Sequence, residues 1–159
     1  MFIKRLEKIQ LTLGVTFLTI FFIAVIIQVI TRYFGVSVIW TEEVANYSFI
    51  WAVFMGAAVM VNRKDHFNFD LLAKKLKGNA KHTLHIVIDG ILLLFCAALF
   101  FYSLTALTTF WDYKWVSLPS MKMGYVWISL PIMSITMVIY LLSHIAGTVK
   151  KITAGEATE

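Results

Sequence analysis

The sequence LTLGVTFLTIFFIAVIIQVIT, from Leu11 to Thr31, contains no charged residue. A helix rises about 1.5 Å per residue, so about 20 apolar residues cross the hydrocarbon core of a bilayer, which is about 30 Å thick. Because lipid offers no hydrogen-bond partners to the backbone, a single segment there must be helical. This stretch therefore predicts a transmembrane helix over residues 11–31.

Three further segments have the same character: residues 44–62, 84–110 and 124–149, of which only the second contains a charged side chain, that of Asp89. Of the 159 residues, 60% are hydrophobic and 14% are charged. Soluble domains carry about 25% charged residues. We therefore expect an all-α integral membrane protein with four transmembrane helices, forming a single membrane domain over residues 1–159. Pro131 lacks a backbone N–H, so it should kink the fourth helix.

Two segments outside these spans are amphipathic. Residues 2–10 place apolar side chains on one helical face, and residues 68–77 repeat apolar side chains at intervals of three and four. We expect both to lie as short helices at the level of the lipid headgroups. Four lysines of the second region are expected to contact phospholipids there: Lys74, Lys75, Lys77 and Lys81.

Positive charge is unevenly divided between the two sides of the membrane. Of the 14 Lys and Arg residues, all but Arg32, Lys114 and Lys122 lie in the two terminal segments and in the loop between the second and third spans. Cytoplasmic loops carry the excess of such residues. We therefore expect both termini in the cytoplasm, and the net charge of +5 needs no nucleic acid to explain it.

Charged side chains flank the first loop. Arg32 ends the first span, and Glu42 and Glu43 begin the second, on the same side of the membrane. An ion pair across this loop is expected, and acidic residues also suit the positive end of a helix dipole. Contact with a partner protein and a proton or cation site are the alternatives.

The third and fourth spans contain the other ionisable candidates. Asp89 follows His85 by one turn, so structural pairing is expected, with a proton site as the alternative. His85 and His144 lie at similar depth, which leaves open a second function, a haem-binding membrane anchor of a quinone-linked oxidoreductase. The lone cysteine, Cys96, is expected to pack in the protein interior.

The sequence contains no phosphate-binding loop, metal-ligand cluster or nucleophile–base pair at motif spacing. We therefore expect no enzymatic activity and no cofactor. The interrupted helices that hold substrate in secondary transporters are also missing. A small multidrug exporter needs a glutamate within its first span, and this span has none. An accessory subunit is favoured.

One set of residues is more specific than composition. It comprises Gln28 to Tyr33 (QVITRY), Trp40 to Glu43 (WTEE), Phe49 to Ala58 (FIWAVFMGAA) and, after these, His66. In order and spacing it resembles the small membrane subunit of tripartite ATP-independent periplasmic (TRAP) transporters, the DctQ-like family. Later residues match this family only in hydropathy and layout.

The resemblance implies a bacterial inner-membrane scaffold subunit. It would join a large elevator-type permease that holds the sodium and substrate sites, and a periplasmic binding protein would deliver an organic acid anion. Sialic acid and C4-dicarboxylates are the expected substrates, and the residues do not decide between them. Five residues would then shape the first hairpin or contact partners: Arg32, Trp40, Glu42, Glu43 and Trp51. His66 and Asp89 would lie at cytoplasmic helix ends.

Overall fold

The computed structural model describes residues 2–63 and 79–153, and this part of the chain is helical apart from its loops. The helices are α1 (Phe2–Tyr33), α2 (Trp40–Arg63), α4 (Asn79–Phe110), α5 (Gly124–Trp127) and α6 (Ser129–Thr153). Four helical segments among these residues are long and apolar enough to cross a membrane. The expected all-α architecture with four such helices is confirmed.

Two expectations concern surface helices. The amphipathic segment 2–10 is continuous with the first span, because α1 runs unbroken from Phe2. No proline or glycine separates that segment from the apolar run. The segment 68–77 lies outside the described residues.

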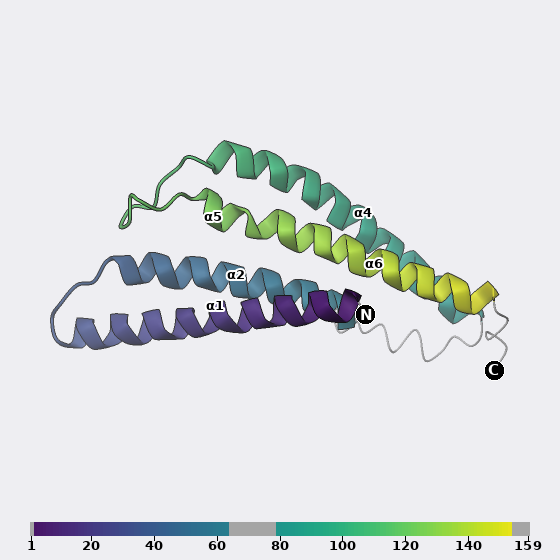
Figure 1. The fold of residues 1–159 in the computed structure, drawn as a ribbon, viewed down its shortest axis with the longest axis horizontal. Coiled ribbons are helices and arrows are strands. Elements are labelled where there is room, and N and C mark those ends of the chain that lie inside the picture. Colours follow the sequence, from purple (N-terminus) through teal and green to yellow (C-terminus); the bar gives the residue numbers. More distant parts are fainter. Residues whose placement is uncertain (1, 64–78, 154–159) are drawn as a thin grey trace.

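The four long helices are arranged as two hairpins side by side (Figure 1). Helix α1 packs along α2, α6 packs along α4, and α2 packs against α6. The order across the molecule is therefore α1, α2, α6, α4, with α2 and α6 in the centre. Half of the most apolar part of the span Gly124–Lys150 is buried within the protein, compared with 6% of that of α1. The outer helices thus leave long apolar faces uncovered within this chain.

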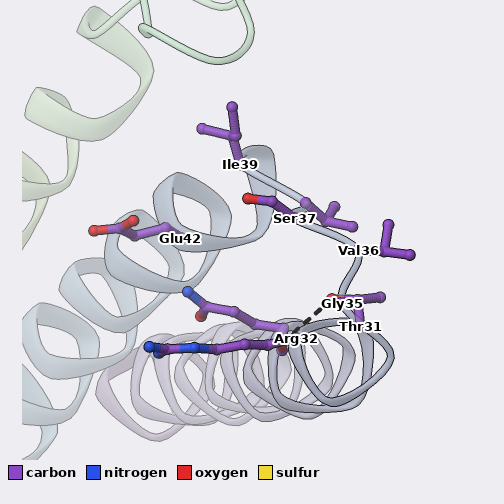
Figure 2. A pocket seen from close by; sticks show the side chains of 9 residues that line it. Thr31, Arg32, Gly35, Val36, Ser37, Ile39 and Glu42 are labelled. Atoms are coloured by element: carbon purple, nitrogen blue, oxygen red, sulfur yellow. Dashed lines mark hydrogen bonds between the residues drawn. The ribbon is translucent and has the colours of Figure 1, made fainter.

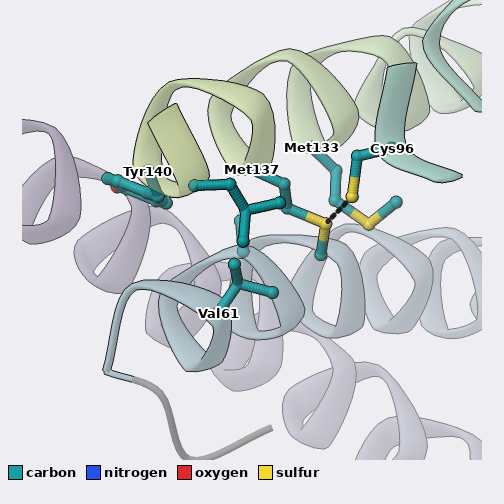
Figure 3. Close-up of a cluster of buried hydrophobic side chains, with 7 residues drawn as sticks. Val61, Cys96, Met133, Met137 and Tyr140 are labelled. Carbon is teal, nitrogen blue, oxygen red and sulfur yellow. Dashed lines mark hydrogen bonds between the residues drawn. The ribbon is translucent and has the colours of Figure 1, made fainter. Parts of the chain in front are cut away.

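The core lies where the two hairpins meet. It consists of Ala58, Val61, Cys96, Met133, Met137, Tyr140 and Leu141 (Figure 3). The Sγ atom of Cys96 lies 3.7 Å from the Sδ atom of Met137, so the cysteine packs inside as expected. Ala58 of α2 is fully buried in this core. Small residues suit helix packing in lipid, where dispersion rather than water exclusion drives association.

The fourth span is divided at Ile128 into α5 and α6. Pro131 has no N–H to donate to the carbonyl of Trp127, and its ring crowds that carbonyl. The hydroxyl of Ser129, the first residue of α6, donates to the carbonyl of Val126 in α5 at 2.6 Å. The helix interruption therefore follows from the proline that the sequence places there.

Candidate functional site: the loop end of the two hairpins

The name "loop end" is used for the end of the molecule that carries residues 34–39 and 111–123. The two hairpins are joined there by Glu43, in the first turn of α2. Its Oε1 accepts the backbone N–H of Val116 at 2.7 Å, and its Oε2 accepts that of Ser117 at 2.8 Å. One carboxylate thus satisfies two amides of the loop that connects α4 to α5.

Aromatic contacts extend the same connection. The rings of Tyr47 and Trp115 are 4.5 Å apart, so α2 also packs against the loop. The indole Nε1 of Trp51 donates to the carbonyl of Tyr125 at 3.0 Å. On its other side, Trp51 stacks on Phe17 of α1 with ring centroids 5.0 Å apart. Trp51 therefore links three elements, α1, α2 and α5.

The ion pair expected between Arg32 and the two glutamates is not formed among the described residues. Glu43 is directed to the second hairpin, where its carboxylate oxygens accept the two amides described above. Arg32 and Glu42 instead line a common pocket of about 400 Å³ (Figure 2). The pocket is formed by Gln28, Thr31, Arg32, Gly35, Val36, Ser37, Val38, Ile39 and Glu42.

Gly35 shapes this pocket because its φ of 73° lies in the left-handed region, which a side chain rarely allows. It reverses the chain after α1, and the N–H of Val36 donates to the carbonyl of Thr31 at 2.9 Å. Thr41, at the start of α2, donates its hydroxyl to the carbonyl of Val38 at 2.7 Å. The first residue of α2, Trp40, is 40% exposed beside the pocket.

A second ion pair lies in the other loop. The Nζ atom of Lys122 is 2.7 Å from Oδ1 of Asp112. The hydrogen bond to Asp112 and the charge of its carboxylate raise the pKa of the Lys122 ammonium. Both side chains are exposed, so this pair adds little to stability.

At the opposite end of the hairpins, Glu7 of α1 holds the end of α2. Its Oε1 accepts the Nε–H of Arg63 at 2.7 Å, and its Oε2 accepts the amide of Asn62 at 2.8 Å. Sequence reasoning missed this contact. The signal was a single glutamate within the basic N-terminal segment, opposite the basic end of the second span.

A buried polar network also went unpredicted. Gln10 is 2% exposed; its amide donates to the hydroxyl of Thr136 at 2.8 Å, and its Oε1 accepts the hydroxyl of Tyr140 at 2.5 Å. These bonds join α1 to α6 across a sequence distance that no local pattern spans. A glutamine at the edge of an apolar run was the available clue, because a buried amide needs partners.

The remaining predicted residues are distributed as follows. Asp89 is buried in α4, and Asp89, His85 and His144 each have an interaction partner. The loop residues His66, Lys74, Lys75 and Lys77 lie outside the described residues, and of Lys81 only the backbone, in α4, is described. In residues 2–63 and 79–153, no group of three or more His, Cys, Asp or Glu is placed to hold a metal ion.

Several polar contacts of the described residues join different helices, as at Gln10 and Glu7, and the large exposed side chains of the spans are mostly apolar. These features define a helical protein of the multi-pass membrane class. Residues 21–151 match the family model described as tripartite ATP-independent periplasmic transporters, DctQ component. The chain belongs to this family of small TRAP transporter permease subunits.

Two relatives place the chain more closely. It is 32% identical over 85 residues to a Haemophilus influenzae protein named as a TRAP transporter small permease. The aligned residues make up 53% of each of the two chains. It is 28% identical over 153 residues to the isethionate TRAP transporter permease DctMQ of Oleidesulfovibrio alaskensis, which covers 91% of this chain and 24% of that protein. The chain thus spans about half the length of the first relative and about a quarter of the second.

Proposed function

We propose that this chain is the scaffold subunit of a sodium-driven TRAP transporter. It pairs with a large elevator-type permease, and a periplasmic binding protein delivers an organic acid anion to the assembly. The chain lies in the bacterial inner membrane with both termini in the cytoplasm. The observation that carries this proposal is the DctQ match over residues 21–151.

The arrangement of the helices supports a scaffold. Polar groups in the described spans are used to join helices, as at Gln10 and Glu43, and the outer helices present long apolar faces. A rigid chain with uncovered apolar faces suits packing against another membrane protein. The sodium and substrate sites then belong to the large permease.

The relative DctMQ supports the pairing. A segment similar to nearly all of this chain forms about a quarter of that protein. Covalent fusion holds two partners at high effective concentration, which is useful when they work as one unit. Sialic acid and C4-dicarboxylates remain the proposed substrates.

The test is uptake into proteoliposomes. The large permease and the binding protein are reconstituted with and without this chain, and a labelled organic acid anion is followed under a sodium gradient. We expect uptake only when all three proteins are present. Equal uptake without this chain would contradict the proposal.

A haem-binding anchor is the alternative function from the sequence. It predicts a Soret band in the visible spectrum of the purified chain, together with shifts when His85 or His144 is replaced. A TRAP subunit gives no such band. The spectrum therefore separates the two functions without any transport assay.

A further inference from the structure

We infer that the pocket at the loop end of the α1–α2 hairpin binds the headgroup of a phospholipid that carries both a phosphate and a primary ammonium group, as phosphatidylethanolamine does. The pocket has one cation, Arg32, and one anion, Glu42, on its walls. The two charges form no salt bridge with each other. A ligand with a charge of each sign matches this arrangement.

The chemistry of the pocket favours such a zwitterion over a simple ion. A guanidinium presents its N–H groups in a fork that fits phosphate oxygens. A carboxylate accepts the N–H groups of a primary ammonium. An anion alone would be repelled by Glu42, and a cation alone by Arg32. Figure 2 shows the charged ends of both side chains directed to the same side of the pocket.

The position of the pocket also fits a headgroup. It lies where the apolar run of α1 ends, and Tyr33, Phe34 and Trp40 lie exposed next to it. Tyrosine and tryptophan prefer the membrane interface. The pocket volume of about 400 Å³ is large enough for a phosphate and an ethanolamine group together.

A groove for an acyl chain lies on the same face of the hairpin. It has a volume of about 250 Å³ and is lined by Gln10, Leu11, Gly14, Val15, Leu18, Phe49, Ala52, Val53 and Gly56. Phe49 and Val53 follow Glu42 by seven and eleven residues, a spacing that keeps side chains on one helical face. At about 1.5 Å per residue, Phe49 lies about 10 Å below Glu42.

That distance matches one phospholipid. Half of a hydrocarbon core is about 15 Å thick, so the chain of a lipid anchored at Glu42 reaches the upper part of the groove, at Phe49 and Val53. Gly14 sits against α2, where its Cβ position lies 3.4 Å from the Cβ of Met55. The small residues at the bottom keep the groove open between Leu18 and Val53. The headgroup pocket and the upper part of the groove thus lie along one face of α2.

The experiment compares three lipids with the same acyl chains. The full chain, purified in a mild detergent, is mixed with phosphatidylethanolamine, phosphatidylglycerol or phosphatidylcholine, and bound lipid is counted by native mass spectrometry. Each exposed ionic hydrogen bond is worth up to about 1 kcal/mol, so we expect about fivefold tighter binding of phosphatidylethanolamine than of the other two. Equal binding of all three lipids would overturn the proposal.

Variants test the two charges separately. Glu42→Gln should remove the preference for phosphatidylethanolamine over phosphatidylglycerol, and Arg32→Gln should weaken binding of all three lipids. The control Lys114→Gln removes a charge at the same end of the molecule but outside the pocket, and should change nothing. If the lipid profile of both pocket variants equals that of the control, the site is not a headgroup site.

The upper part of the groove is tested by Val53→Phe. Val53 lines the upper part of the groove and is 45% exposed, so the larger side chain occupies space that the acyl chain would fill. Lipid binding should fall while the helix content stays the same. Unchanged lipid binding would contradict the chain position.

Two other occupants give different results. Soluble phosphoethanolamine should compete only weakly with phosphatidylethanolamine for the pocket, because it has no acyl chain. Competition as strong as that of the lipid would mean that the pocket binds a soluble zwitterion instead. If the Arg32 and Glu42 variants lose a large membrane partner but keep their lipid profile, the pocket receives a protein side chain. Either result overturns the proposal and leaves the proposed transporter function standing.

Discussion

Replacing Glu43 by glutamine should loosen the connection between the two hairpins. The carboxylate accepts the N–H groups of Val116 and Ser117 at 2.7 and 2.8 Å, one on each oxygen. A carboxamide has only one acceptor oxygen, and its NH₂ group faces the second amide as another donor. One of the two backbone amides therefore loses its partner in Glu43→Gln.

The magnitude follows from these two bonds. A hydrogen bond to a charged group contributes about 1.5–3 kcal/mol, and a neutral one about 1 kcal/mol. Because the site is partly exposed, we use the low end of the range for each ionic bond. Replacing two ionic bonds by one neutral bond then costs about 2 kcal/mol of stability. This corresponds to an opening equilibrium on the order of 30-fold larger.

Hydrogen exchange measured by mass spectrometry reads this opening directly. In Glu43→Gln, a peptide covering residues 112–121 should exchange faster, whereas peptides of the α1–α2 interface should not change. The matched control is Glu42→Gln. It removes the neighbouring carboxylate, which lines the pocket and makes no hydrogen bond to the loop of residues 111–123. Unchanged exchange in Glu43→Gln, or an equal increase in both variants, would show that Glu43 does not hold the loop of residues 111–123.

Two further perturbations concern buried contacts. Gln10→Leu should lower the free energy of unfolding by about 1–3 kcal/mol, because the hydroxyl of Tyr140 is left without its acceptor. Adding Tyr140→Phe should recover part of this loss, as measured by thermal unfolding. No recovery in the double variant would contradict the hydrogen-bond network. Gly124→Ala should cost about 1–3 kcal/mol and change the tryptophan fluorescence, because the new methyl group overlaps the ring of Trp111. In the control Gly147→Ala, the new methyl group meets open space, so the free energy of unfolding should rise by up to about 1 kcal/mol. Similar losses of stability in both glycine variants would argue against close packing at Trp111.

The helices were predictable because lipid imposes their length. A run such as residues 11–31 has one stable state in a bilayer, so hydropathy alone indicates it. The break at Ile128 follows in the same way from Pro131, because a missing amide acts locally. Residues 2–10 form one helix with the first span, because no residue there would end the helix.

The partners of individual polar groups could not be predicted. The sequence places Arg32 near both glutamates, so an ion pair was the natural expectation. In the structure, the carboxylate of Glu43 binds amides more than 70 residues away, a contact that depends on how the two hairpins pack. The link from Gln10 to Tyr140 has the same origin. Local patterns carry no information about which spans become neighbours.

We propose that this chain works as the small subunit of a larger membrane complex. The most direct measurement is the mass and composition of the material that co-purifies with an affinity-tagged chain, expressed from its own genomic locus and extracted in a mild detergent. We expect a stable complex with a much larger membrane protein in a constant ratio. A monodisperse chain without such a partner, in a detergent that preserves other membrane complexes from the same cells, would contradict it.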